Sequence, residues 1–201
     1  MYNEEGMYFI SFATINWIDV FIREQYFQII TDSLNFCIDN KGMIVYGYCI
    51  MPSHIHMIFR DSNHTPSKLL KEFKTFTSKQ MRFAIENNPR ESRREWILGM
   101  MKDTGAKNSN VKHFQFWQQN NQPIELWSNH VIDQKLDYIH NNPVVAGFVL
   151  EPHHWKYSSA MDYAGMKSDV KVYLVEWIVK LIGNGSTSYK FALTMGLIPI
   201  P

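Results

Sequence analysis

Hydrophobic residues follow two different periods near the start of the chain. Residues 7–14 (MYFISFAT) alternate and are rich in aromatic and β-branched side chains, which is typical of a half-buried strand. Residues 22–37 instead show a helical spacing of apolar side chains, at Ile22, Tyr26, Ile29, Ile30, Leu34 and Cys37. Gly42 follows at a position that suits the left-handed cap of a helix. We therefore expect a strand and then a helix.

The next two segments predict a β-hairpin. Residues 43–51 (MIVYGYCIM) have the composition of a strand, and Pro52-Ser53 interrupts them. Residues 54–60 (HIHMIFR) alternate again. Two adjacent antiparallel strands joined by a short turn at Pro52 are expected.

A second helix is predicted to begin at Thr65 and Pro66, since Thr suits the cap and Pro the first helical position. Its apolar face consists of Leu69, Leu70, Phe73, Phe76, Thr77, Met81 and Ile85. The helix should end at Asn87-Asn88-Pro89. Residues 90–113 have little periodicity apart from a short helical stretch at 95–101, and we interpret them as an insertion or a mobile loop.

The remaining pattern completes an α+β fold. Residues 113–118 (HFQFWQ) alternate as a strand, and residues 133–142 predict a helix that ends at Pro143. The resulting order, β-α-β-β-α-β-α, resembles a ferredoxin-like or RRM-like layout. We expect an antiparallel sheet that carries helices on one face and leaves the other face available.

Composition narrows the class of protein. With 201 residues and 45% hydrophobic content the chain should form a globular core. Cys37 and Cys49 fall in a helical and a strand pattern, so neither a disulfide framework nor a cysteine metal cluster is expected. No apolar run approaches the roughly 20 residues of a bilayer span. Glu4 and Glu5 replace the basic start of a signal peptide, so we expect a cytoplasmic protein.

The charge of +1 is unevenly distributed. Residues 60–112 hold 12 Lys/Arg and 6 Asp/Glu, against 8 and 13 in the rest of the chain. This segment predicts a phosphate-binding patch, with Phe76, Phe83 or Trp96 as stacking surfaces. A solvated helix face would have the same composition. The candidate DNA-binding residues are Lys68, Lys71, Lys74, Lys79, Arg82, Arg93 and Arg94.

Two histidines are candidates for a metal site. His54 and His56 are two positions apart in a predicted strand, so both imidazoles should project from one face. Two histidines leave a divalent ion open to a substrate oxygen but require a third ligand. Ordinary half-exposed strand histidines would show the same spacing.

Tyr138 is the candidate nucleophile. At ~100° per residue it lies about 200° around its helix from the inward Leu136, so it should face away from the core. Gln134 and Asn142, four residues to either side, form one polar stripe with it. A tyrosine can attack phosphorus when a metal polarises the phosphate, and the product is a phosphotyrosine. The plainer interpretation is an amphipathic helix whose tyrosine hydroxyl meets water.

Five segments carry a resemblance to a known family. Between residue 7 and about residue 165 the chain resembles IS200/IS605-like single-tyrosine (Y1) transposases of the HUH type, most closely the REP-associated tyrosine transposases of bacteria. The segments are YFISFAT at 8–14, YCIMPSHIHMIFR at 48–60, LLKEFKTFTSKQ at 69–80, LDYIHNNPVVAGFV at 136–149 and WKYSSAMDY at 155–163.

The resemblance implies an HUH endonuclease fold and a DNA-nicking and DNA-joining activity. It implies that His54 and His56 bind Mg²⁺ or Mn²⁺, that Asn142 completes the metal site and that Tyr138 attacks DNA. Single-stranded DNA next to a hairpin would be cleaved to a 5′-phosphotyrosine and a free 3′-hydroxyl, and the reverse reaction would rejoin strands. The protein would then be bacterial, associate with the nucleoid when bound to DNA, and need no nucleotide cofactor.

The domain organisation follows from the same match. Residues 1–165 are expected to form the catalytic domain, with an insertion at about 90–112, and residues 166–201 a C-terminal extension. The apolar period of residues 170–182 predicts a helix in that extension. Ser53 stands where family members often carry Asn. The resemblance does not decide whether the protein is a monomer or a homodimer. It also leaves open whether the active site lies within one chain or is shared between two.

Two other functions fit the same residues. One is a non-catalytic, RRM-like nucleic-acid-binding module, which predicts salt-sensitive binding that a chelator leaves unchanged. The other is a metal-dependent phosphodiesterase that uses activated water, which predicts cleavage that needs His54 but not Tyr138.

Overall fold

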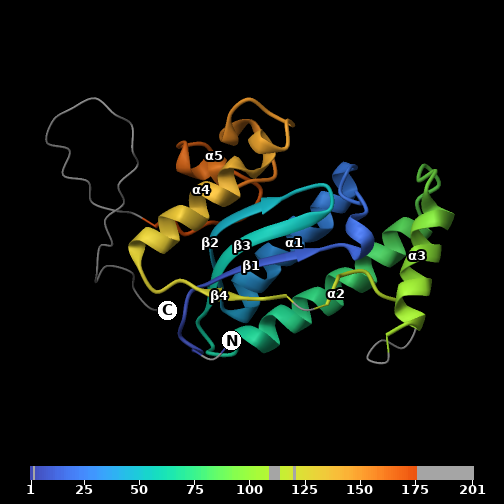
Figure 1. Ribbon diagram of the computed structural model, residues 1–201, viewed down its shortest axis with the longest axis horizontal. Coiled ribbons are helices and arrows are strands. Elements are labelled where there is room, and N and C mark those ends of the chain that lie inside the picture. The colour runs from blue at the N-terminus through green and yellow to red at the C-terminus, as the bar shows by residue number, and fades with distance from the viewer. Residues whose placement is uncertain (2, 109–113, 120, 176–201) are drawn as a thin grey trace, which may run out of the picture.

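A four-stranded antiparallel sheet forms the centre of the computed structural model, which describes residues 1, 3–108, 114–119 and 121–175 (Figure 1). The strand order is β2-β3-β1-β4. The strands are β1 (Tyr8–Ala13), β2 (Met43–Ile50), β3 (His54–Asp61) and β4 (Ile124–Glu125). The fold is therefore α+β, as expected from the sequence.

The predicted hairpin is confirmed by the pairing of β2 with β3. Its strands close next to the turn, where Ile50 lies opposite Ile55 and the Met51 amide donates to the His54 carbonyl at 2.8 Å. β1 pairs with the other edge of β3, with Ser11 opposite His56 and Ala13 opposite His54. The strand that carries the histidines is thus an inner strand of the sheet.

Helices α1 (Glu24–Lys41) and α2 (Pro66–Glu86) pack on one face of the sheet. Their apolar sides bury the alternate strand residues Ile10, Met57 and Phe59. Both helices were predicted, and Gly42 caps α1 with φ 75° as its position suggested. At the start of α2 the Thr65 hydroxyl donates to an Asp61 carboxylate oxygen at 3.1 Å and does not cap the helix.

The second face of the sheet is partly covered by α4 (Asn129–Val145), although the sequence pattern left that face free. Leu136 and Ile139 of α4 are buried with Phe9 and Ile58 of the sheet. A Cβ at Gly47 would lie 2.6 Å from a Leu136 methyl carbon, so glycine lets Leu136 approach β2 closely. The helix also begins earlier than expected and continues through Pro143.

Residues 90–108 correct the predicted loop, although the short helical stretch expected at 95–101 is present within a longer helix. They contain α3 (Arg94–Ala106), whose Ile97 and Met101 are buried in the main core. A Cβ at Gly105 would meet the backbone of Phe114 at 2.6 Å, so the helix also packs closely on the following segment. The sequence obscured α3 because a short inward stripe interrupted by glycines gives a weak helical period.

The strand predicted at residues 113–118 is also wrong in its described part. Residues 114–118 form a single bridge between Trp117 and Thr14, and β4 supplies the fourth strand of the sheet. Phe116 and Trp117 are both buried although they are consecutive. A regular strand would direct them to opposite faces, and the alternation of the sequence was therefore misleading.

The C-terminal part of the described chain follows the outer edge of β2. Past the short helix η2 (Pro152–His154), the Trp155 indole donates to the Ile50 carbonyl at 3.0 Å. After α5 (Ala160–Tyr163) the Tyr173 amide donates to the Val45 carbonyl at 2.8 Å. Residues 170–175 are not helical, which corrects the helix predicted there, and residues 176–182 lie outside the described residues.

The cysteines and the lengths of the helices bear on two expectations drawn from composition. Cys37 and Cys49 are both free and buried. Burial raises the pKa of the Cys37 thiol to about 11. Among the described residues no helix combines the length and the apolar character that a membrane crossing requires.

Candidate active site

The two histidines project from the sheet face that α4 covers. Because side chains alternate along β3, His54 and His56 point to the side opposite the α1 and α2 helices, as predicted. Their ring centroids are 4.7 Å apart. His56 is buried, with 3% of its surface exposed, and His54 is partly exposed.

Helix α4 brings the other two predicted residues to the histidines. The Tyr138 ring lies edge-on to His56 with 5.1 Å between centroids, and the Asn142 amide nitrogen Nδ2 lies 3.3 Å from His56 Nε2. Their spacing of four residues places both on one side of the helix. The four residues therefore meet within one chain, and Tyr138 remains 48% exposed to solvent.

Both imidazoles are held in the neutral form that binds metals. Burial lowers the pKa of His56 to about 3, and the charges of His54 and Lys135 act in the same direction. Burial also lowers the pKa of His54, against the opposing effects of a hydrogen bond with Asn142 and the charge of Asp19. No proton has to be displaced near neutral pH before either nitrogen can bind a cation.

The donor atoms fit a divalent cation. His56 Nδ1 is buried and has no hydrogen-bond partner among the described residues. Ser53 Oγ lies 3.2 Å from His54 Nδ1, which orients that ring and leaves Nε2 available. The Asn142 side chain also carries an amide oxygen, and in this structure its amide nitrogen is the atom that faces His56 Nε2, so a rotation of the amide would turn the oxygen toward the cation. Two imidazoles and an amide oxygen leave coordination positions open for a substrate oxygen.

Sequence reasoning missed two neighbours of Tyr138. The Lys135 ammonium lies 4.9 Å from the centroid of Phe9 and 5.8 Å from the centroid of Tyr138. Phe9 in turn stacks on His56 at 5.9 Å. The spacing of three residues on one helix could have pointed to Lys135. The position of Phe9 beside Tyr138 could not be predicted without knowing how β1 and α4 pack together.

Contacts with β2 fix the position of α4. His140 Nε2 lies 2.9 Å from Ser159 Oγ, and that hydroxyl accepts a hydrogen bond from the Tyr48 amide at 2.9 Å. Burial lowers the pKa of His140 to about 4, so this imidazole is neutral. Together with the contact between Leu136 and Gly47, this bond anchors the helix that presents Tyr138.

Some of the predicted DNA-binding residues share a groove of about 760 Å³ between α2 and residues 114–119, 121 and 123. Lys71, Lys74 and Lys79 line it, and the Arg82 guanidinium lies 4.7 Å from the centroid of Phe114 at the same groove. The Lys74 ammonium donates to the Gln118 carbonyl at 3.1 Å. Burial lowers the pKa of Lys74 to about 8.

The other predicted DNA-binding residues do not line this groove. Arg93 donates to Glu91 at 3.2 Å and to the Asp19 carbonyl at 2.8 Å, so its guanidinium has a structural role. Arg94 lies 3.9 Å from Glu95. Lys68 is exposed on the first turn of α2.

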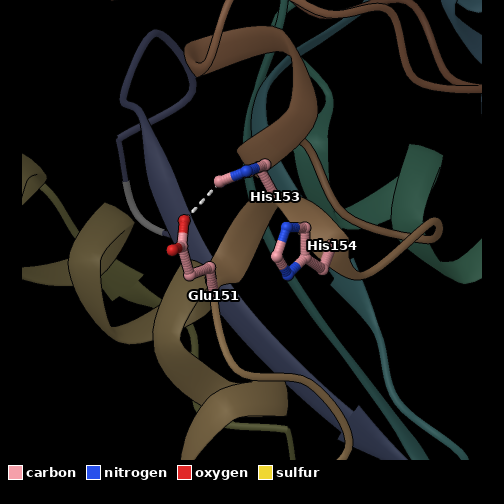
Figure 2. Close-up of side chains that lie close together, drawn as sticks. All are labelled: Glu151, His153 and His154. Atoms are coloured by element: carbon pink, nitrogen blue, oxygen red, sulfur yellow. Dashed lines mark ion pairs between the residues drawn. The ribbon is translucent and has the colours of Figure 1, made fainter.

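A second group with metal-binding side chains lies on η2. The side chains of Glu151, His153 and His154 lie close together in Figure 2, and one ligand atom of each lies within 4.8 Å of the others. His153 Nδ1 lies 3.5 Å from a Glu151 carboxylate oxygen. This group comes from one short turn and shares no residue with the His54 and His56 pair. Metal-binding experiments must therefore distinguish the two groups.

Comparison with solved structures supports the fold. A structure of the REP-associated tyrosine transposase bound to a REP hairpin aligns with a TM-score of 0.57 and 17% identity, covering 86% of this chain and 89% of that chain. A protein from Deinococcus radiodurans R1, described as a candidate transposase, aligns with a TM-score of 0.42 and 17% identity over 67% of this chain and 88% of that chain. The second score is too low to add to the argument.

Comparison of sequences identifies the family. Curated proteins give no significant match. The family model described as "Transposase IS200 like" matches residues 7–109, about half of the chain, including β1, both histidines and α2. The chain therefore belongs to the IS200-like transposase family, whose members are enzymes that act on DNA.

Proposed function

We propose that the protein nicks and rejoins single-stranded DNA, with Tyr138 as the nucleophile and His54, His56 and Asn142 as ligands of Mg²⁺ or Mn²⁺. The observation that carries this proposal is the meeting of Tyr138, His56 and Asn142 on one sheet face within a single chain. A nucleophile beside an open cation site is the arrangement that phosphoryl transfer requires.

The chemistry follows from the position of the phenol. A cation bound by the histidines would supply positive charge that polarises the scissile phosphate. The Tyr138 oxygen forms a bond to phosphorus while the bond from phosphorus to the 3′ oxygen breaks. The half-exposed phenol can lose its proton to solvent, and the departing oxygen takes up a proton as a 3′-hydroxyl. The product is a 5′-phosphotyrosine, and reversal of the same step rejoins the strands.

The surroundings of Tyr138 suit a polyanionic substrate. The Lys135 ammonium lies beside the phenol ring, where it can contact a phosphate oxygen. The groove lined by Lys71, Lys74 and Lys79 offers a second place for the DNA backbone. We propose a DNA hairpin with a single-stranded flank as the substrate, since the solved relative was bound to a REP hairpin.

The residues proposed for the site meet within one chain, and on that ground we propose that a monomer is sufficient for cleavage. In this proposal residues 1–165 form the catalytic domain, with the remainder as an extension. The protein would act in the bacterial cytoplasm and at the nucleoid when bound to DNA.

Covalent capture of DNA tests the proposal. Wild-type protein, a hairpin-bearing single strand and Mn²⁺ should give a protein–DNA adduct that survives denaturing electrophoresis. Tyr138→Phe should abolish the adduct, and so should His56→Ala or a chelator. Two controls should retain it: Tyr173→Phe, which removes another partly exposed phenol, and His153→Ala, which disrupts the Glu151 group.

Other outcomes identify the alternatives. Salt-sensitive binding without an adduct, unchanged by a chelator, would favour a non-catalytic module. Cleavage that persists in Tyr138→Phe but not in His54→Ala would favour activated water. An adduct that persists in Tyr138→Phe would show that the nucleophile is a different residue.

A further inference from the structure

The loop after β1 holds two consecutive residues in a backbone conformation that side chains disfavour. Asn16 has φ 50° and Trp17 has φ 56°, both in the left-handed region, and neither is glycine. A bulky residue is rare there, and such strain persists only where the surrounding structure imposes it. Trp17 is nevertheless 57% exposed to solvent, so burial of the indole does not compensate for the strain.

Anchors on both sides of this pair impose the conformation. Ile15 and Ile18 flank it and are both buried in the main core. The buried Thr14 hydroxyl hydrogen-bonds the Ile18 carbonyl at 2.7 Å and the Ser53 carbonyl at 3.0 Å. The loop is therefore fixed at both ends, and Asn16 and Trp17 are directed outward.

The anchoring also places the indole at the candidate active site. Trp17 lies edge-on to His54, with 5.3 Å between ring centroids. Ser53, whose carbonyl also accepts the Thr14 amide at 2.8 Å, directly precedes His54. The exposed indole and the proposed metal-binding histidine are thus held in one rigid unit. The protein therefore gives up little conformational entropy when a ligand stacks on Trp17.

We propose that Trp17 is a stacking surface for one unpaired nucleobase next to the scissile phosphate, an inference that rests on the proposed function. A phosphate bound between His54 and Tyr138 places an adjacent base within reach of an indole that contacts His54. Asp19 follows on the same loop and is exposed, and its negative charge disfavours a phosphate there. The loop is therefore suited to the flat face of a base, which aromatic side chains bind with little regard to sequence.

An abasic scan tests this inference. The non-cleaving Tyr138→Phe protein is titrated with hairpin-bearing single strands, each lacking one base near the foot of the hairpin. One abasic position should weaken binding by roughly 5- to 100-fold, the range expected for loss of one stacked base. When Trp17→Ala is introduced into the Tyr138→Phe protein, binding of the intact strand should weaken by a similar factor. The abasic position should then have no further effect.

Control variants separate stacking from a structural role. Trp17→Phe should retain most of the affinity and the abasic effect, whereas Trp17→Leu should lose both while keeping the same melting temperature. Phe36→Ala removes an exposed aromatic ring from α1, on the other side of the sheet, and should change nothing.

The outcomes distinguish this inference from the proposed function. If Trp17→Ala binds the intact strand as tightly as its parent, or keeps the abasic effect, Trp17 does not stack on a base. If wild-type protein forms no covalent adduct with the same strands and Mn²⁺, the proposed function fails. A Tyr138→Phe protein without affinity for any strand contradicts both.

Discussion

The Tyr138 ring stands edge-on to the buried ring of His56, 5.1 Å away between centroids, although Tyr138 follows His56 by 82 positions in the sequence. Phe9 contacts both rings, and Lys135 lies over Phe9 and Tyr138. The proposed nucleophile and a proposed metal ligand from one chain are therefore held together by the packing of α4 on the sheet.

Mixing two inactive variants tests whether the site lies within one chain. His56→Ala and Tyr138→Phe should each form no adduct, and an equimolar mixture should remain inactive because no chain retains both residues. Covalent capture after co-expression and after simple mixing is the measurement. Recovery of a substantial part of wild-type capture would mean that Tyr138 of one chain serves the histidines of another.

Gly47→Ala should displace the nucleophile without touching it. The added methyl group would lie 2.6 Å from a Leu136 methyl carbon, so the Leu136 side chain must shift, and because that side chain is buried we expect α4 to move with it. Because a displacement of about 1 Å can cost on the order of 100-fold in rate, we expect the rate of capture to fall by about 10- to 100-fold. Rapid-quench measurement of adduct formation gives this rate.

Gly99→Ala is the matched control for that variant. A Cβ at Gly99, inside α3, meets nothing within 4 Å. It should leave the rate unchanged and increase the free energy of unfolding by up to about 1 kcal/mol, since alanine favours a helix. Equal rates for Gly47→Ala and wild type would show that the contact with Leu136 does not position Tyr138.

Lys135→Met should slow covalent capture because it removes the cation beside the phenol. We expect a loss of about 10-fold, in the range of one charge-assisted hydrogen bond to phosphate, and a weaker dependence of binding on salt. Lys135→Arg should restore most of the rate. A salt dependence identical to that of wild type would mean that Lys135 does not contact the DNA backbone.

Glu91→Gln should destabilise the junction of α1 with α3. The buried Glu91 carboxylate accepts hydrogen bonds from Arg23 at 2.8 Å and Arg93 at 3.2 Å. Loss of these charge-assisted bonds should lower the free energy of unfolding by about 1–3 kcal/mol at pH 7. Chemical denaturation of the variant and of wild type measures the difference.

The same difference should depend on pH. Burial alone would raise the pKa of the Glu91 carboxyl, but the bonds from Arg23 and Arg93 outweigh it and hold that pKa below its ordinary value. The stabilisation is therefore complete above the pKa of the unfolded state, near 4.5, and is lost as the pH falls through the lower pKa of the folded state. A difference that stays constant down to pH 3 would contradict this assignment.

Local patterns predicted the parts of the site that lie on one element. The period of two in β3 placed His54 and His56 on one face, and the spacing of four in α4 placed Tyr138 with Asn142. Whether those two elements meet depends on long-range contacts such as Gly47 with Leu136 and His140 with Ser159, for which the sequence carries no local signal. The meeting within one chain therefore required the structure.

The errors in the predicted fold also have physical causes. The inward stripe of α3 is short, and β4 has only two residues, so neither produces a clear period. The left-handed backbone at Trp17 is imposed by the burial of Ile15 and Ile18 and by Thr14. Residue type alone would not place a tryptophan there.

Peptide mass spectrometry of the trapped adduct tests the central claim most directly. Tryptic cleavage after Lys135 and Lys156 releases residues 136–156, in which Tyr138 is the one tyrosine. After nuclease treatment, the account predicts that this peptide carries a nucleotide joined through its 5′-phosphate, with fragmentation locating it on Tyr138. A nucleotide on any other residue, or an unmodified 136–156 peptide in the purified adduct, would contradict it.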